Sequence, residues 1–244
     1  MRIVTWNCQG AFRKKADSIL KLRPDILIIQ ECESFDKLGA LSLKYCDSYW
    51  YSDSDRKGIA IFTFSDYKIE LLPQFNPEFR FVLPLRIYNN GLSLTLFAIW
   101  AMNNKENRVA RYIGQVWFAI NYYYEIFDSS TLLIGDFNSN KIWDYKDRVG
   151  SHSDVVTKLY EYDIHSVYHK INNEEQGEET QPTFYLQRKL EKPYHIDYVF
   201  ASNKLLDLVK RIEIGKVSDW LEISDHMPII VELELQKHNH CNNH

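Results

Sequence analysis

The feature that most constrains the fold of this chain is a series of short apolar runs, rich in β-branched residues. Such runs, bounded by polar segments, are typical of buried strands. Most are continuously hydrophobic, as strands covered on both faces are, whereas residues 231–235 alternate as a strand with one solvated face does. The runs cover residues 3–6, 26–30, 59–64, 81–88, 92–100, 132–134, 196–201 and 228–235. We therefore expect strands to dominate the core.

Segments with apolar residues at helical spacing lie between these runs. They cover residues 15–22, 108–127 and 153–162. Strands interspersed with helices predict an α/β fold, and two sheets packed face to face with helices outside suit a chain of 244 residues. We expect one catalytic domain over residues 1–235, an exposed polar loop at residues 172–181 and a disordered tail over residues 236–244.

The charge of the chain does not favour a general affinity for polyanions. The formal net charge is −4 at pH 7, so no basic field covers the whole surface. Short basic runs, such as residues 13–15 and 189–192, either contact phosphates or are ordinary solvated surface. Binding of nucleic acid would therefore depend on a local site.

The cysteines favour a reducing compartment. Their spacing is irregular, and a chain of this length does not need disulfides to fold. The N-terminus enters a strand pattern without a targeting signal, and no stretch is long and apolar enough to span a membrane. We expect free thiols in a cytoplasmic protein with no membrane partner and no obligate protein partner. The cysteines are Cys8, Cys32, Cys46 and Cys241.

Polar residues stand at the ends of the apolar runs, where the chain leaves the core. They are Asn7, Glu31, Asp136, Asn138, Asp197, Asp225 and His226. Taken singly, most have an ordinary structural explanation, because Asp and Asn cap helices and form turns. Asp197 fits that explanation least well, since a carboxylate inside an apolar strand is costly unless it is hydrogen-bonded or paired. Taken together, these residues predict one site.

The residue types in this set suit a hard divalent cation and a phosphate. Mg²⁺ takes oxygen ligands, usually one or two carboxylates, and keeps waters that a substrate can displace. Glu31 and Asp225 supply anions, while Asn7 and Asn138 add neutral oxygens and amide donors. One histidine beside carboxylates, without clustered histidines or CxxC pairs, argues against zinc. We therefore expect Mg²⁺ or Mn²⁺ as the cofactor.

The segments that carry these residues resemble the endonuclease/exonuclease/phosphatase family, which includes abasic-site endonucleases, pancreatic-type DNases, sphingomyelinases and inositol polyphosphate phosphatases. The resemblance runs, in family order, through residues 5–7, 29–31, 135–138, 195–198 and 224–226. It implies a four-layer α/β/β/α sandwich of two mixed β-sheets flanked by helices, with a metal cleft at one end.

The resemblance also implies a role for each polar residue. Asp136 would orient or deprotonate the attacking water, with Asn138 as its partner on the water or the phosphate. His226 would face the non-bridging oxygens, and Asp197 would fix its ring. A carboxylate beside His226 should raise its pKa and keep it protonated. The residues that would hold the metal are Asn7, Glu31 and Asp225.

Residues 97–103 depart from the family pattern. Abasic-site nucleases tend to carry a tyrosine in this segment and pancreatic-type DNases a histidine, whereas the nearest aromatic residue here is Trp100. An indole donates one N–H and cannot act as an acid. Trp100 either stacks on an unpaired base of the substrate or fills the core at a strand end.

The remaining thiols and histidines suggest structural roles. Cys8 and Cys32 directly follow two site residues, and the alternation of a strand would turn each toward the opposite face, so we interpret both as core thiols. His152, His165 and His169 lack the spacing from carboxylates that suggests ligands, so we expect them at the surface or at helix ends.

The favoured function is a metal-dependent phosphodiesterase, and specifically a nuclease that cleaves DNA or RNA by in-line attack of a carboxylate-oriented water. Nucleic acid would then be the partner, as substrate. One alternative keeps the metal site but takes a small-molecule or inositol phosphate, because loops set the substrate on a shared core. Another is a catalytically silent module that binds nucleic acid.

Overall fold

The strands of this protein bury both of their faces, and four layers result. In β1 (Arg2–Asn7), Ile3 packs in a central core and Val4 packs in a second core on the other face of the sheet. In β7 (Ser93–Trp100), Leu96 belongs to the same central core, whereas Phe97 packs in a third core. Because successive side chains of a strand point to opposite faces, two sheets enclose the central core and the other two cores lie outside them.

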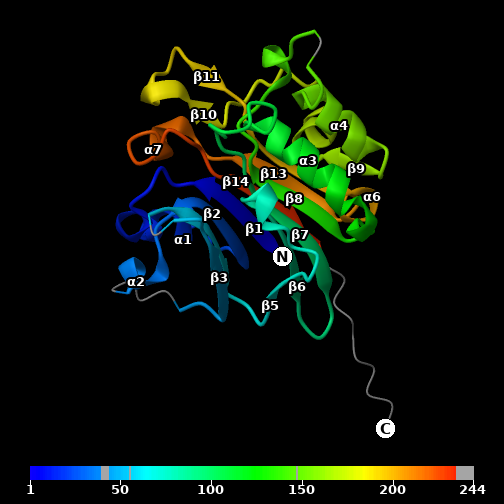
Figure 1. Ribbon diagram of the computed structural model, residues 1–244. Helices are drawn as coiled ribbons and strands as arrows, with labels where there is room; N and C mark the ends of the chain where they lie inside the picture. Colours follow the sequence, from blue (N-terminus) through cyan, green and yellow to red (C-terminus); the bar gives the residue numbers. More distant parts are fainter. Residues whose placement is uncertain (40–43, 55, 147, 235–244) are drawn as a thin grey trace.

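The computed structural model describes residues 1–39, 44–54, 56–146 and 148–234. Within these residues, two six-stranded sheets face each other (Figure 1). The tail expected over residues 236–244, which contains Cys241, lies outside the described residues, as does Leu235.

The first sheet has the strand order β13-β14-β1-β2-β4-β3. In it, β1 and β2 (Ile26–Cys32) run parallel and the other neighbours are antiparallel. The parallel pair places the carboxyl ends of β1 and β2 side by side. The remaining strands are β3 (Asp47–Tyr51), β4 (Gly58–Thr63), β13 (Val209–Ile214) and β14 (Ile229–Leu233).

The second sheet has the order β5-β6-β7-β8-β12-β9. Here β7 and β8 run parallel, and β12 runs antiparallel to β8, so the end of β8 lies beside the start of β12. A separate hairpin pairs β10 (Phe184–Tyr185) with β11 (Pro193–Tyr194). The other strands of the sheet are β5 (Lys68–Leu71), β6 (Val82–Tyr88), β8 (Thr131–Asp136), β9 (Ile164–Ser166) and β12 (Asp197–Ser202).

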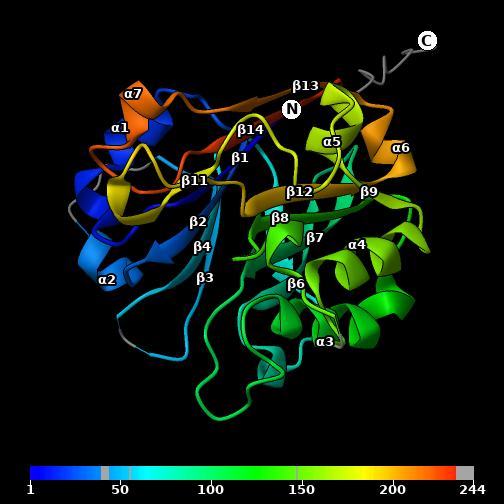
Figure 2. The same cartoon turned by 90° about the horizontal axis from the view of Figure 1, so that it is seen from above.

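Helices cover the outer side of each sheet, as Figure 2 shows from above. The predicted α/β/β/α sandwich of two mixed sheets is therefore confirmed. On the first sheet lie α1 (Ala16–Leu20), α2 (Phe35–Leu38) and α7 (Val217–Trp220). On the second sheet lie α3 (Ile113–Tyr123) and α4 (His152–Tyr160), whereas α5 (Val167–Asn172) and α6 (Asn203–Leu206) pack Val167 and Leu205 into the central core. The 3₁₀ turns are η1 (Phe12–Lys14), η2 (Pro77–Phe79), η3 (Tyr124–Ile126), η4 (Lys141–Trp143) and η5 (Leu186–Arg188).

The helix expected over residues 108–127 is shorter in the structure. It begins at Ile113, because Tyr112 has φ 50° and ψ −120°, a conformation outside the helical region. By contrast, α4 begins one residue before its predicted start. Ser151 caps it, accepting a hydrogen bond from the backbone N–H of Asp154, whose side chain in turn accepts from the backbone N–H of Ser151.

In the part of the chain that the structure describes, no helix has the length and hydrophobicity that crossing a bilayer requires.

Candidate active site

Strand ends from both sheets come together around two buried carboxylates. Asn7 ends β1 in the first sheet, and Asp136 ends β8 in the second. Asn7 Nδ2 donates to Asp136 Oδ2 at 2.9 Å, which joins the two sheets. Asp197, the first residue of β12, is the direct antiparallel partner of Asp136. All three residues are buried, so the two carboxylates lie side by side where water has little access.

The chain around Asp136 adopts two unusual backbone conformations. Gly135 has φ 138°, and a Cβ there would lie 2.0 Å from the carbonyl oxygen of Ile99, so only glycine lets β8 pass this close to β7. Asn138 has φ 50°, which asparagine tolerates better than most residues. Its backbone N–H donates to Asp136 Oδ1 at 2.8 Å. Both oxygens of Asp136 are therefore held by donors.

The surroundings of Asp136 bring its pKa close to neutrality. Burial raises the pKa of Asp136 to about 7, and the negative charge of Asp197 acts in the same direction. The positive charge of His226 and the donors from Asn7 and Asn138 oppose this rise. A carboxylate with such a pKa can accept a proton in the physiological pH range.

His226 is held as a buried cation. Its ring Nδ1 donates to both oxygens of Asp197, at 2.9 and 3.1 Å. Burial lowers the pKa of His226, but Asp197, Asp136 and Asp225 outweigh burial and raise it to about 10. The backbone is fixed as well, because the indole of Trp6 donates to the carbonyl oxygen of His226 at 2.9 Å. The ring therefore presents positive charge next to Asp136 at neutral pH.

Glu31 reaches the site through an irregularity in β2. It has φ 60°, and the pairing of β2 with β4 shifts register between Gln30 and Cys32, which marks a β-bulge that re-aims the side chain. Asn7 Nδ2 lies 3.4 Å from Glu31 Oε1. The ammonium group of Lys57 donates to the other oxygen, Oε2, at 2.5 Å.

Asp225 joins the site from the segment that precedes β14. Gln9 Nε2 donates to Asp225 Oδ2 at 2.8 Å, and the guanidinium of Arg188 donates to Gln9 Oε1. Burial and, more weakly, the charge of Glu31 raise the pKa of Asp225, against the lowering effects of His226 and Arg188. A polar chain therefore links this carboxylate to the η5 turn.

Two sets of side chains offer ligand atoms for a divalent ion. The first is Asp136, Asp197 and His226, whose ligand atoms all lie within 4.8 Å of one another. The second is the set expected from the sequence, namely Asn7, Glu31 and Asp225. Because Asp197 already accepts from His226 and that ring is protonated, the first set is poorly suited to a metal. The second set offers oxygen donors, and this chemistry fits a hard cation such as Mg²⁺.

The structure contradicts a base-stacking role for Trp100. The residue is 6% exposed and packs in the central core, with its ring 4.9 Å from that of Phe81. Its position in β7 directs the side chain between the two sheets and away from solvent. The structural alternative for Trp100 therefore holds.

The thiols next to the site are buried, as predicted. Cys8 and Cys32 both pack in the core beneath α1, and neither forms a disulfide. Burial raises the pKa of Cys8 to about 12, so it stays a thiol at neutral pH and does not act as a nucleophile.

The expected surface position of His152, His165 and His169 is wrong, because all three are buried, although His152 does lie at a helix end, as the first residue of α4. Partners of His152 and His169 come from the loop at residues 172–181, which is only partly exposed. Gln176 Oε1 lies 3.0 Å from His152 Nε2, and Glu179 Oε1 lies 3.0 Å from His169 Nε2. Polar residues of this loop therefore fold inward, and spacing along the sequence gives no indication of such contacts.

Several residues of the site were not singled out from the sequence. Lys57 and Gln9 contact the carboxylates directly. Thr183 Oγ1 accepts hydrogen bonds from the backbone N–H groups of Ile196 and Asp197, at 2.9 and 3.0 Å, and so fixes the start of β12. These residues lie outside the apolar strand runs that identified the others, and nothing in their local pattern distinguishes them.

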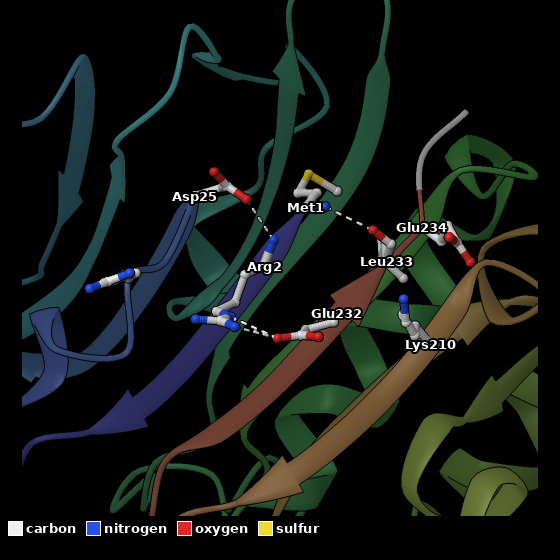
Figure 3. A pocket seen from close by; sticks show the side chains of 8 residues that line it. Met1, Arg2, Asp25, Lys210, Glu232, Leu233 and Glu234 are labelled. Atoms are coloured by element: carbon white, nitrogen blue, oxygen red, sulfur yellow. Dashed lines mark hydrogen bonds and ion pairs between the residues drawn. The ribbon is translucent and has the colours of Figure 1, made fainter. Parts of the chain in front are cut away.

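A separate hollow of about 440 Å³ opens at the other end of β1, beside Met1 and Arg2 (Figure 3). Two of its charged residues form an ion pair, and a third accepts a backbone hydrogen bond. The Arg2 guanidinium contacts Glu232 at 2.5 Å, and the Arg2 backbone N–H donates to Asp25 at 2.7 Å. Asn7 lies at the opposite end of the same strand, so this hollow is distant from the candidate site.

Comparison with models of protein families gives a match over most of the chain. A model described as the Endonuclease/Exonuclease/phosphatase family matches residues 4–226. No protein of curated function matches the sequence.

Solved structures with the same fold are distant in sequence. One is a 3' phosphatase, NExo, from Neisseria, bound to product DNA hairpin, with 18% identity and a TM-score of 0.71 over 96% of this chain and 100% of that chain. A second is the endonuclease domain of TRAS1, a telomere-specific non-LTR retrotransposon, with 18% identity and a TM-score of 0.67 over 97% and 99%. A third is an AP endonuclease from Archaeoglobus fulgidus, with 16% identity and a TM-score of 0.67 over 96% and 100%. At these identities the likeness concerns the fold.

Proposed function

This chain belongs to the Endonuclease/Exonuclease/phosphatase family, and we propose that within it the protein is a Mg²⁺- or Mn²⁺-dependent nuclease. Members of this family are phosphoric ester hydrolases. The choice of nucleic acid as substrate is supported by the solved structures of similar fold, which include a phosphatase bound to a DNA hairpin and two endonucleases. The proposed catalytic domain spans residues 1–235.

One observation carries the proposal: Asp136 lies next to a buried anion, Asp197, and a buried cation, His226. Asp136 is paired across the sheet with Asp197, and both carboxylates act on the protonated ring of His226. A site that hydrolyses phosphodiesters needs a group that takes a proton from water and a positive group that faces the phosphoryl oxygens. These three residues supply both.

The proposed reaction is an in-line attack of water on phosphorus. Asp136 accepts a proton from the water as the new P–O bond forms, and the bond to the leaving oxygen breaks on the opposite side. Asn138 orients the water or the phosphate through its side-chain amide. His226 donates to a non-bridging oxygen, and Asp197 keeps its ring oriented and charged.

Asn7, Glu31 and Asp225 would hold the metal ion. Bound there, it would supply positive charge to the phosphoryl group during attack. Asn7 has a second role in the proposal, because the same amide donates to Asp136 and lies next to Glu31. It thereby fixes the position of the proposed base relative to the metal-binding carboxylates.

We also propose a cytoplasmic location for the protein. The free state of Cys8, Cys32 and Cys46 supports this proposal, because disulfides are rare in reducing compartments.

A panel of substrates tests the proposed function. Purified protein with Mg²⁺ would be incubated with single-stranded DNA, duplex DNA with an abasic site, single-stranded RNA and inositol phosphates. The proposal predicts cleavage of at least one nucleic acid and loss of that cleavage in EDTA. If the protein releases phosphate from inositol phosphates and cleaves no nucleic acid, the proposed function would change from nuclease to small-molecule phosphatase. Tight binding of nucleic acid without Mg²⁺ binding and without cleavage would indicate a silent binding module.

A further inference from the structure

A pocket of about 290 Å³ opens directly beside the candidate site. Its lining includes Asn138, so it adjoins the turn that follows Asp136. The rest of its lining includes Tyr112 and Ile113 at the start of α3, Trp143 at the end of η4, and Arg148 beyond η4. This volume is at the lower end of the roughly 300–1,000 Å³ typical of ligand pockets. It suits one nucleotide unit and is too small for a duplex.

Trp143 presents an aromatic surface to this pocket, and hydrogen bonds fix the 3₁₀ turn that carries it. The residue is 45% exposed, so part of its ring is accessible from solvent. It ends η4, whose N-cap is the buried Asn140. The Asn140 side chain accepts from the Ile142 backbone N–H and donates to the His195 carbonyl oxygen and to the Tyr198 hydroxyl, at 2.9 and 3.1 Å. These bonds tie the start of η4 to β12, the strand that begins with Asp197.

Aromatic rings connect Trp143 to the candidate catalytic histidine. The centroid of the Trp143 ring lies 5.0 Å from that of Tyr194 in β11. Tyr194 pairs with Phe184 in β10, and the Phe184 ring lies 4.7 Å from the ring of His226. The row of rings ends at His226, which faces Asp136. Successive bases of a strand could therefore stack along these rings and lead away from the reacting phosphate.

Arg148 brings a positive charge to the pocket and forms no ion pair with a carboxylate of the described residues. Its guanidinium donates to the carbonyl oxygen of Arg111 at 3.3 Å and lies 5.9 Å from the ring of Tyr145. The acidic residue of the pocket, Asp144, uses its oxygens to accept from the backbone N–H groups of His152 and Ser153, both at 2.9 Å. Asp144 keeps its negative charge beside Arg148, so the described lining is close to neutral, and the Arg148 guanidinium is the cationic group of the pocket that can donate to a phosphate.

We propose that this pocket binds an unpaired nucleotide next to the scissile phosphate, with Trp143 stacking on its base and Arg148 contacting its phosphate. The inference rests on the proposed nuclease function and specifies its substrate as a single-stranded or locally unpaired polynucleotide. A base inside a duplex cannot offer its face to Trp143 without leaving the stack. An inositol phosphate has no aromatic face for Trp143 to stack on. It carries several phosphate groups, whereas the described lining of the pocket contains one arginine.

The test measures binding in EDTA, where cleavage cannot interfere. Fluorescence anisotropy would give Kd for a labelled strand of ten thymidines and for a strand of the same length in which every base is replaced by a hydrogen. Trp143→Ala should raise Kd for the thymidine strand about fivefold to a hundredfold, the range expected for loss of one stacked base. Its Kd for the baseless strand should stay the same. Arg148→Gln should weaken binding of both strands. It should also reduce the slope of log Kd against log salt concentration by the amount expected for the loss of about one phosphate contact.

Matched variants separate stacking from general damage. Trp143→Phe keeps an aromatic face and should bind the thymidine strand within about threefold of the wild type. Tyr124→Ala removes another exposed aromatic residue, located after the far end of α3, and should change nothing. Equal Kd values for wild type and Trp143→Ala would overturn the proposal, as would an equal loss for the baseless strand. If the wild type cleaves no nucleic acid with Mg²⁺, the proposed function fails, while the binding data in EDTA still decide the role of the pocket.

Discussion

Asn7 and Asp136, which are 129 residues apart in the sequence, are joined by a buried hydrogen bond of 2.9 Å between Nδ2 and Oδ2. The bond connects the last residue of β1 to the last residue of β8, and thus one sheet to the other. It also lowers the pKa of Asp136 against the upward effect of burial. The geometry of the site and the acidity of its proposed base therefore depend on the same contact.

Asn7→Ala should shift the acid limb of the pH–activity profile. Removal of the donor raises the pKa of Asp136 above its wild-type value of about 7, so the base form appears only at higher pH. Activity at pH 7 should fall by about tenfold or more and recover in part at pH 9. Cleavage rates measured from pH 5 to 10 would check this. An unchanged acid limb would mean that Asp136 is not the group that must lose its proton.

The wild-type profile should be bell-shaped. Asp136 must be ionised and His226 protonated, and their pKa values of about 7 and about 10 place the maximum between these limits. The two limbs describe the coupled cluster as a whole. A rate that keeps rising beyond pH 11 would contradict a protonated His226.

Asp136→Asn should stabilise the fold at alkaline pH while it removes activity. The folded pKa of Asp136 is raised, so its contribution to stability is full below the unfolded value near 3.8 and is lost as pH rises through about 7. A neutral side chain avoids this loss. Urea denaturation at pH 5 and pH 9 should show a greater advantage of Asp136→Asn at pH 9, and an equal difference at both pH values would refute the assignment.

Mg²⁺ should raise the melting temperature of the wild type but not that of Glu31→Ala. A ligand that binds the native state stabilises it in proportion to the logarithm of its concentration, and we propose Glu31 as a ligand. Glu70→Ala, in the edge strand β5, is the matched control and should respond as the wild type does. Equal shifts in all three proteins would place the ion elsewhere.

Glu179→Ala should destabilise the protein by about 2–4 kcal/mol, because several buried donors lose their acceptor. Burial alone would raise the pKa of Glu179, but donors from His169, Asn140 and the Gly177 backbone lower it to about 2. This contribution is present above the unfolded value near 4.5 and disappears as pH falls toward 2. The exposed neighbour Glu178 offers a control, since Glu178→Ala should change the free energy of unfolding by less than about 0.5 kcal/mol.

The layers of the fold were predictable, because a strand that is buried on both faces appears in the sequence as a continuous run of apolar residues. Runs such as residues 26–30 are apolar at every position that packs in a core. These runs predicted the strands, and the strands with their interspersed helices predicted two packed sheets. The sequence predicted that Asp136 and Asp197 belong to one site, but not that they are direct partners across the second sheet.

Other contacts were not predictable, because they depend on loops that fold back from a distance. Lys57 reaches Glu31 from the loop before β4, and Glu179 reaches His169 from a loop that its composition suggested was exposed. No local periodicity encodes either contact. Trp100 illustrates a different limit, since its sequence position allowed both a buried and a substrate-facing ring, and only the register of β7 between the sheets decides between them.

The most direct test of the central claim is the single-turnover rate at which Mg²⁺-loaded protein cleaves a single-stranded oligonucleotide at pH 8. Asp136→Asn and His226→Ala should each lower this rate by at least about a hundredfold, while Asp207→Asn, at an exposed position after α6, should leave it unchanged. Rates within about threefold of the wild type for both site variants would contradict the account, as would undiminished cleavage in EDTA.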